Sequence, residues 1–352
     1  MKKVGASMAP ILGTGVPSRH SSGRLRQMFV CLFWIRLPVV IASGCGASQP
    51  APAEAPSGSL VHVRTQQALA ADGLFWATLR AGNFDGIEAA LQATTAAYLA
   101  DPGDAITTAH VGWLHIWRIA ERARLEHVSP TIVDETTLAS DYFDRAVRLA
   151  PSEPRYLGFL ASSLLAQGKI HHDADLTHRG SEVMRGAVDA WPAFNLFTSG
   201  YTLAGEPRDS TEFALGLSQE WRNLEVCSGL HINPAHPDFD AVFAAQERRR
   251  IAGMGRDARA CLNSEIAPYN MEGFMLNLGD MLAKNGQVEL ATQAYAATRR
   301  VSDYGTWPYR EILETRLNDV PAVARQFNAD RDKTMMFRSA FACAGCHEAA
   351  RP

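Results

Sequence analysis

The stretch Leu278-Gly-Asp-Met-Leu-Ala-Lys-Asn-Gly-Gln-Val-Glu-Leu-Ala-Thr-Gln-Ala-Tyr295 decides the fold. Its apolar residues recur at spacings of three and four, which is typical of amphipathic helices. Gly286 separates two such helices, because glycine between periodic segments marks a turn. Gly279 and Ala291 are small residues, which two helices need where their backbones approach closely. The stretch therefore predicts a hairpin of two antiparallel helices.

Similar segments recur along the chain, so this hairpin is one unit of a repeat. The matching positions are Ala139, Phe143, Ala146 and Pro151; Leu160, Ala161, Leu164 and Gly168; Gly180, Met184, Ala187 and Pro192; Leu278, Gly279, Leu282, Gly286, Ala291 and Tyr295; and, more loosely, Gly82, Phe84, Ile87 and Leu91. They resemble the tetratricopeptide repeat over much of residues 70–300, although insertions separate the units and the usual first-helix tryptophan is absent. The resemblance implies an all-α, tetratricopeptide-like stack of helical hairpins (an α-solenoid), whose concave surface binds peptides or partner proteins.

The composition agrees with a helical globular protein. The chain has 352 residues, of which 47% are hydrophobic and 20% charged, and its many alanines favour helix over strand. A generic α-helical bundle is the alternative to a repeat stack. The net charge of −3 gives no basic footprint for nucleic acid. Nucleophile elbows, phosphate loops and dinucleotide fingerprints are missing from the sequence, which favours an electron carrier or interaction protein over an enzyme.

The N-terminal stretch has the features of an export signal, because basic residues precede an apolar run. The run ends in Ala42-Ser-Gly-Cys45, which resembles a bacterial lipobox although Ala42 replaces the usual leucine and Arg36 interrupts the run. The resemblance implies that Cys45 is lipidated and that a lipid anchor holds an exported, periplasmic or cell-envelope protein at the membrane. An ordinary signal or an uncleaved anchor is the alternative. Residues 46–63 are rich in proline and alanine and are predicted to form an extended tether.

The C-terminal sequence Cys343-Ala-Gly-Cys346-His347 has the spacing of a c-type haem attachment site. Two thiols one helical turn apart can add to the two haem vinyl groups, and the adjacent imidazole is then held at the iron. The motif resembles that of the cytochromes c, which implies one covalent haem c with Cys343 and Cys346 as thioethers and His347 as the proximal ligand. A local disulfide, a redox dithiol and a zinc site are the alternatives.

A second iron ligand cannot follow the motif as it does in small cytochromes c, because only five residues come after His347. The cytochromes c′ share this C-terminal placement, often with five-coordinate iron. A sixth ligand in this chain must come from upstream. Met335 or Met336 is the nearest in sequence, and His231 and His236 are remote candidates.

Several polar residues lie outside these motifs. Cys227 and Cys261 can form a disulfide in an exported chain. Residues 221–237 break the repeat rhythm and are predicted to be an inserted loop. The histidines of the segment His171-His172-Asp173-Ala-Asp175-Leu-Thr-His178 are predicted to lie in a solvated loop between helices rather than in a metal site.

Three functional hypotheses follow. The first is a membrane-tethered c-type monohaem protein for electron transfer or haem binding, whose repeat surface docks a redox partner or an envelope protein. The second is a non-redox scaffold lipoprotein of the cell envelope, with Cys343 and Cys346 in a disulfide. The third is a haem sensor that binds small gases. The predicted boundaries are 1–45 for the leader, 46–63 for the tether, 64–330 for the helical domain and 331–352 for the haem-attachment segment.

Overall fold

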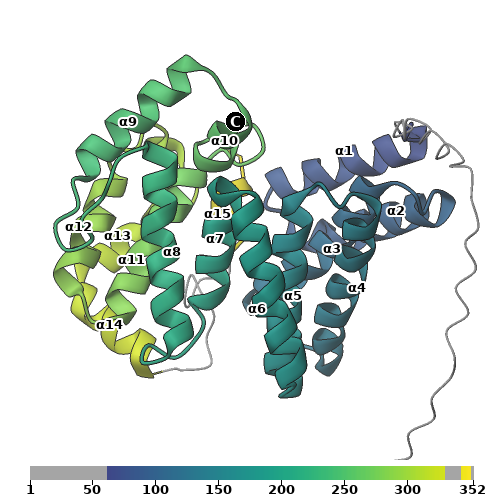
Figure 1. Ribbon diagram of the computed structural model, residues 1–352, viewed down its shortest axis with the longest axis horizontal. Helices are drawn as coiled ribbons and strands as arrows, with labels where there is room; N and C mark the ends of the chain where they lie inside the picture. Colours follow the sequence, from purple (N-terminus) through teal and green to yellow (C-terminus); the bar gives the residue numbers. More distant parts are fainter. Residues whose placement is uncertain (1–61, 330–341, 350–352) are drawn as a thin grey trace, which may run out of the picture. The chain divides into compact units, whose positions relative to one another are not determined.

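The computed structural model describes residues 62–329 and 342–349, which belong to one compact unit, Leu60–Pro352 (Figure 1). All regular secondary structure in these residues is helical, and successive helices pack as adjacent pairs. The prediction of an all-α stack of helical hairpins is therefore confirmed. The predicted leader with Cys45, most of the tether, and the candidate ligands Met335 and Met336 lie outside the described residues.

Four helical hairpins follow one another in the first part of the stack. They are α1 (Gln66–Arg80) with α2 (Ile87–Ala100), α3 (Ala105–Ala120) with α4 (Asp134–Leu149), α5 (Pro154–His171) with α6 (Ala174–Ala190), and α7 (Pro192–Leu203) with α8 (Thr211–Ser228). Short 3-10 helices lie in the connections at Phe84–Gly86, Arg122–Arg124 and Pro130–Val133. The second helix of each of the first three hairpins also contacts the first helix of the next, which is how a helical-repeat stack builds a continuous core.

The chain then departs from strict alternation. The remaining elements are α9 (Phe239–Ala252), α10 (Arg256–Cys261), the hairpin α11 (Asn270–Lys284) with α12 (Val288–Thr298), a 3-10 turn at Tyr304–Thr306, α13 (Arg310–Asn318), α14 (Val320–Ala329) and the short α15 (Ala344–His347). A disulfide between Cys227 and Cys261 joins α8 to α10. The prediction of an inserted loop over 221–237 is wrong for its first half. Residues 221–228 are the last two turns of α8, and the connecting loop covers 229–238.

Capping residues explain where several helices begin. Side chains that accept first-turn N–H groups stand before α1, α3, α6, α8 and α9, at Thr65, Asp104, Asp173, Ser210 and Asp238. Proline occupies the first turn of α5 and α7, where its missing N–H costs nothing. The cluster from His171 to His178 is the corner between α5 and α6, and its three histidines are exposed.

Helices approach closely at glycines that the repeat pattern marks. A Cβ on Gly279 of α11 would lie 2.2 Å from Cε1 of Tyr295 on α12. Tyr295 cannot easily move away, since it is fully buried and its hydroxyl donates to Oδ1 of Asp280 at 2.5 Å. A Cβ on Gly180 would similarly meet the side chain of Leu165 at 2.9 Å. The small residues of the repeat are thus required by the packing of one helix on the next.

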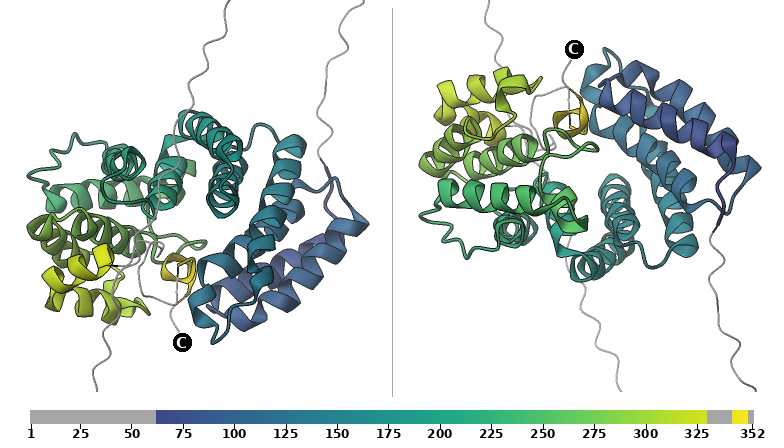
Figure 2. Two further views of the ribbon diagram at one scale, coloured as in Figure 1. Left: turned by 90° about the horizontal axis from the view of Figure 1, so that it is seen from below. Right: turned by 90° about the horizontal axis from the view of Figure 1, so that it is seen from above.

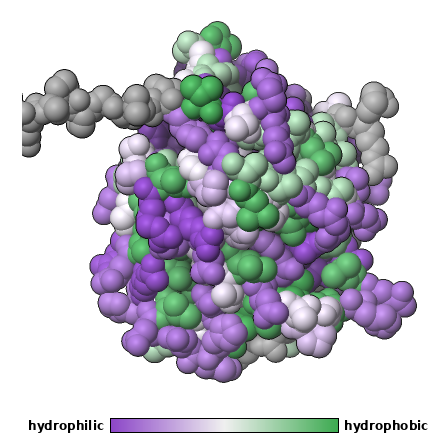
Figure 3. All heavy atoms as spheres, turned by 90° about the vertical axis from the view of Figure 1, so that its right-hand side faces the viewer, coloured by the Kyte–Doolittle hydropathy of each residue, from purple (hydrophilic) through white to green (hydrophobic). Residues whose placement is uncertain are grey.

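Apolar residues on the outer surface are scattered. On the face shown in Figure 3, hydrophilic residues surround separate apolar ones. The large apolar side chains that are exposed come from many helices and include Leu69, Leu99, Leu149, Leu215 and Ile251. Such scattered exposure is normal for folded proteins. Among the described helices, none has the length and apolar character needed to cross a membrane.

Gly279→Ala should destabilise the fold by about 1–3 kcal/mol, because the new methyl group overlaps a tyrosine that is buried and hydrogen-bonded. Gly73→Ala in α1 is the matched control, since no described atom outside its own helix lies within 4 Å of the new Cβ. That control should be stabilised by about 0.5–1 kcal/mol, the usual gain for glycine to alanine within a helix. Urea unfolding midpoints measure both effects. A Gly279→Ala protein as stable as the Gly73→Ala protein would contradict this packing.

Candidate functional site

The described C-terminal segment, residues 342–349, returns to the stack and lies between α1 and α11 (Figure 2). Backbone hydrogen bonds hold it from both sides: Tyr269 N–H donates to the carbonyl of Cys346 at 3.0 Å, and Ala349 N–H donates to the carbonyl of Arg80 at 2.7 Å. The motif is therefore built into the helical body, although it is far from the other elements in sequence.

The side chain of Glu121, at the C-terminal end of α3, makes the central contact with this segment. Its Oε1 accepts two backbone hydrogen bonds, from Ala342 at 2.9 Å and from Ala344 at 2.8 Å. The other oxygen lies 2.9 Å from Nε of Arg124. Glu121 is fully buried, and a buried carboxylate persists only when such partners replace water. These bonds fix the start of the turn that carries both cysteines.

Aromatic residues before α13 complete the anchorage. The indole of buried Trp307 donates to the carbonyl of Gly345 at 2.8 Å, and the hydroxyl of Tyr309 donates to Glu348 at 2.5 Å. Close packing also requires glycine at Gly273, where a Cβ would lie 2.2 Å from Sγ of Cys346. No spacing in the sequence connects Trp307 or Tyr309 with the motif.

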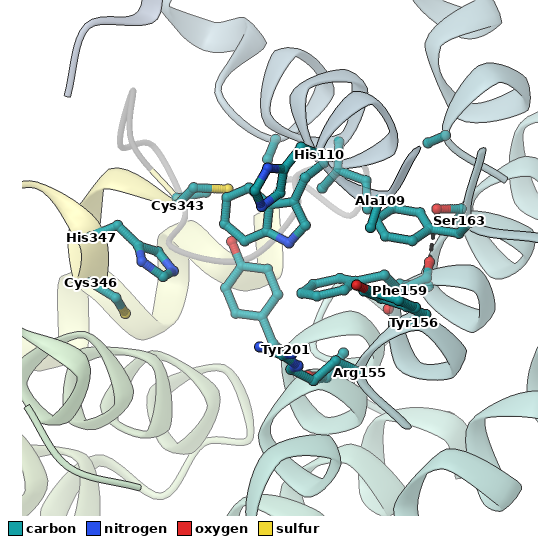
Figure 4. A pocket seen from close by; sticks show the side chains of 18 of the residues that line it. Ala109, His110, Arg155, Tyr156, Phe159, Ser163, Tyr201, Cys343, Cys346 and His347 are labelled. Carbon is teal, nitrogen blue, oxygen red and sulfur yellow. Dashed lines mark hydrogen bonds between the residues drawn. The ribbon is translucent and has the colours of Figure 1, made fainter. Parts of the chain in front are cut away.

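The motif opens into a cavity of about 600 Å³ (Figure 4). Its walls come from the hairpins of the first part of the stack together with the segment after α10, and aromatic residues dominate them. The aromatic lining residues are Phe75, Trp76, Trp113, Phe143, Tyr156, Phe159, Phe194, Phe197 and Tyr201. Cavities of this size and apolar character are typical binding sites for cofactors and other small molecules.

Cys343, Cys346 and His347 all line this cavity. The imidazole of His347 donates from Nδ1 to the carbonyl of Ile266 at 2.7 Å, and the ring of Trp113 packs edge-on against it with centroids 5.3 Å apart. The bond fixes the orientation of the ring and leaves Nε2 as the nitrogen with a lone pair. Metal-binding histidines are commonly held in this way by a carbonyl or carboxylate. The desolvation that accompanies burial lowers the pKa of His347, which favours the neutral form that metals bind.

Neither cysteine of the motif is in a disulfide. Burial raises the pKa of Cys346 to about 12, and the charges of Glu272 and Glu220 add to the effect. Burial also raises the pKa of Cys343 well above its usual value, with a further contribution from Glu121. Both side chains are therefore neutral thiols at pH 7. Redox dithiols, in contrast, have lowered pKa values in electropositive and partly exposed surroundings.

A second histidine, His110 of α3, lines the same cavity and was not among the candidates from sequence. Its Nδ1 lies 3.0 Å from Oδ1 of Asp72, and its ring stacks on Phe75 at 3.9 Å. Burial alone would raise the pKa of Asp72, but the hydrogen bond and charge of His110, together with the charge of Arg64, lower it overall. An Asp72 to His110 spacing of 38 residues is not a recognisable motif, so the pair becomes visible only in the fold.

Positive charge outweighs negative charge among the described residues that line the cavity. Asp72 is the one carboxylate among them, whereas four arginines are present: Arg64, Arg122, Arg155 and Arg259. Arg64 and Arg155 pair with carboxylates, Asp104 at 2.9 Å and Glu153 at 2.8 Å. Arg122 and Arg259 bond backbone carbonyls and keep further N–H donors, which suits a ligand that carries carboxylates.

His231, His236, Cys227 and Cys261, the other predicted site residues that the structure describes, do not line the cavity. His231 is almost fully exposed in the loop after α8 and bonds Glu225 at 2.8 Å, and His236 is exposed in the same loop. Neither lines the cavity, so the structure does not bring either histidine to the motif. The Cys227–Cys261 disulfide belongs to a separate apolar cluster with Ala193 and Leu262.

Glu121→Ala should loosen the docked segment, because two backbone N–H groups lose their acceptor. Leaving buried donors unpaired costs about 1–3 kcal/mol, which corresponds to roughly 5- to 150-fold faster amide exchange through local opening. Hydrogen exchange of the peptide that contains Ala342 and Ala344 measures this change. Glu126→Ala removes an exposed carboxylate and should have no effect. Equal exchange in both variants would show that Glu121 does not hold the segment.

Glu272 should make stability depend on pH. Burial raises its pKa to about 7, although hydrogen bonds from its own backbone and from Asn263 oppose the shift. Between about pH 4.5 and pH 7 the folded state therefore keeps a proton that the unfolded state releases, so the free energy of unfolding falls as the pH rises. Relative to Glu272→Gln, the wild type should lose about 2–3 kcal/mol between pH 5 and pH 8. Denaturant titrations at the two pH values test this, and an unchanged difference between the proteins would contradict it.

Comparison of the sequence with protein-family profiles and with curated proteins finds no match. The function of the site is therefore inferred from its geometry. Two neutral thiols and one oriented imidazole line the wall of an apolar cavity whose arginines outnumber its carboxylates.

Proposed function

We propose that the protein is a c-type monohaem protein that transfers electrons, with one haem bound covalently at Cys343 and Cys346 and with His347 on the iron. One observation carries the proposal. Both thiols and the imidazole line the same apolar cavity of about 600 Å³, and the Nδ1 bond of His347 to Ile266 leaves Nε2 for a metal.

The residues present fit such a group in three respects. The cysteines are unpaired thiols, which is the form that adds to vinyl groups. Aromatic side chains dominate the wall and match the flat apolar face of a porphyrin. Arg122 and Arg259, with N–H donors to spare, suit the two propionates. A bound haem would supply an iron that accepts and releases a single electron.

The chain's own residues would control that chemistry. The largely apolar wall gives the cavity a low polarity, which disfavours the more highly charged oxidation state of a metal centre. Glu121, Trp307 and Tyr309 hold the motif in the wall, which would keep the imidazole of His347 in position beside a bound haem. The stack then serves as the housing of the cofactor as well as a surface for a partner.

Location and partner complete the proposal. Lipidation at Cys45 and the tether after it would hold the helical body near a membrane in the cell envelope. The repeat surface would dock a redox partner or another envelope protein, as helical-repeat surfaces commonly do. The scaffold alternative places Cys343 and Cys346 in a disulfide, and a redox dithiol is a separate alternative for the same pair. The unpaired, buried thiols with raised pKa values favour haem attachment over that alternative.

Haem staining of denatured protein tests the attachment. We expect a stained band of the full-length chain when the protein is made in a host with cytochrome c maturation machinery. The Cys343→Ser/Cys346→Ser double variant should lose the stain, since neither thioether can form. Cys227→Ser/Cys261→Ser is the matched control, because it removes the other two cysteines of the body and should keep the stain. An unstained wild-type protein from a competent host would refute the proposal and favour the scaffold.

A further inference from the structure

The cavity contains a second imidazole that the proposed haem attachment does not use. His110 projects from α3, whereas His347 projects from α15, and both line the cavity (Figure 4). His110 lies three residues before Trp113 on α3, so the two side chains are neighbours on one face of the helix. Trp113 in turn contacts the ring of His347. His110 therefore stands one helical turn from a residue that touches the proximal histidine.

The surroundings of His110 fix its orientation. Nδ1 faces the carboxylate of Asp72 at 3.0 Å, while stacking on Phe75 with ring planes only 8° apart holds the imidazole plane. Arg64 lies 3.7 Å from the same oxygen of Asp72 and 2.9 Å from Asp104, which keeps the carboxylate in place. A carboxylate this close to Nδ1 attracts the N–H side of the imidazole, and carboxylates commonly orient metal-binding histidines in this way.

The free nitrogen of His110 has no competing partner in the described structure. None of the described groups hydrogen-bonds its Nε2, and His110 lines the cavity. The described cavity lining has no methionine and no lysine. Tyr201 also reaches toward the motif (Figure 4), but a phenol must lose its proton to bind iron, and burial raises its pKa well above the usual value.

We propose that Nε2 of His110 is the second axial ligand of the haem iron, with Asp72 as the residue that positions it. This inference rests on the haem attachment proposed above. It names a residue of the first part of the stack, whereas His231 and His236 lie in the exposed loop after α8. His110 and His347 would then give a six-coordinate iron with two histidine ligands, and binding of haem would join α3 to the C-terminal segment.

The decisive experiment compares His110→Ala with the wild type, both carrying covalent haem. The wild type should show the absorption and electron paramagnetic resonance spectra of low-spin, six-coordinate iron. In His110→Ala the iron should become high-spin and bind carbon monoxide readily, and added imidazole should restore the low-spin spectrum. Imidazole rescue separates loss of a ligand from loss of the fold, because a misfolded cavity would not be repaired by a small ligand.

Four further variants test the assignment of the ligand. Tyr201→Phe removes the other donor near the motif, and His178→Ala removes an exposed histidine on α6; both should keep the low-spin spectrum. Asp72→Asn should keep the haem and raise its reduction potential relative to the wild type. An amide beside the imidazole makes it a weaker electron donor to the iron than a carboxylate does. His110→Met should also shift the potential upward, since methionine ligation raises it.

The outcomes separate a failure of His110 as the ligand from a failure of haem attachment. Stained His110→Ala protein with an unchanged low-spin spectrum would overturn His110 as the ligand and leave the haem attachment standing. A low-spin signal that is lost in Tyr201→Phe instead would also overturn it. A wild-type protein without haem would refute both proposals. Loss of the low-spin signal in His110→Ala alone, with recovery in imidazole, is the result that supports the inference.

Discussion

The carboxylate of Glu121 accepts hydrogen bonds from two backbone N–H groups of the C-terminal segment, and the site depends on this contact. It joins the end of α3 to residues more than 200 positions later in the chain. The contact fixes the start of the turn that carries the motif, and the bonds of Tyr269, Trp307 and Tyr309 hold the rest of the segment. A buried carboxylate is costly unless its partners are in place, so the docked segment and the end of α3 stabilise each other.

The cavity gives the stack a role beyond that of a docking surface. Helical repeats usually bind partners on an exposed concave face. Here the first hairpins line an apolar cavity, and the C-terminal segment contributes part of its wall. The residues that orient the two imidazoles come from different places in the chain: Ile266 holds His347, and Asp72 holds His110. A cofactor in this cavity would be held by elements from both ends of the described chain.

Sequence predicted the all-α stack because its signals are local. Gly279 and Tyr295 lie within one hairpin, and their contact follows from helical spacing. The thiols and imidazole of the motif are local for the same reason. Sequence did not predict Glu121, Trp307, Asp72 or His110 as parts of the site, since their partners are distant in the chain and single polar residues carry no pattern. The predicted loop over 221–237 wrongly included the end of α8. The histidines and prolines after residue 230 indicated a loop, although the helix continues to Ser228.

The most direct test of the central claim is the mass of the tryptic peptide that begins at Ser339 and contains Cys343, Cys346 and His347. The protein should be purified from a host that matures c-type cytochromes. The account predicts that this peptide carries the added mass of one haem, resistant to denaturation and acidic extraction, with fragment ions that place it on both cysteines. A peptide with the mass of its amino acids alone, or with the two cysteines joined as a disulfide, would contradict the account.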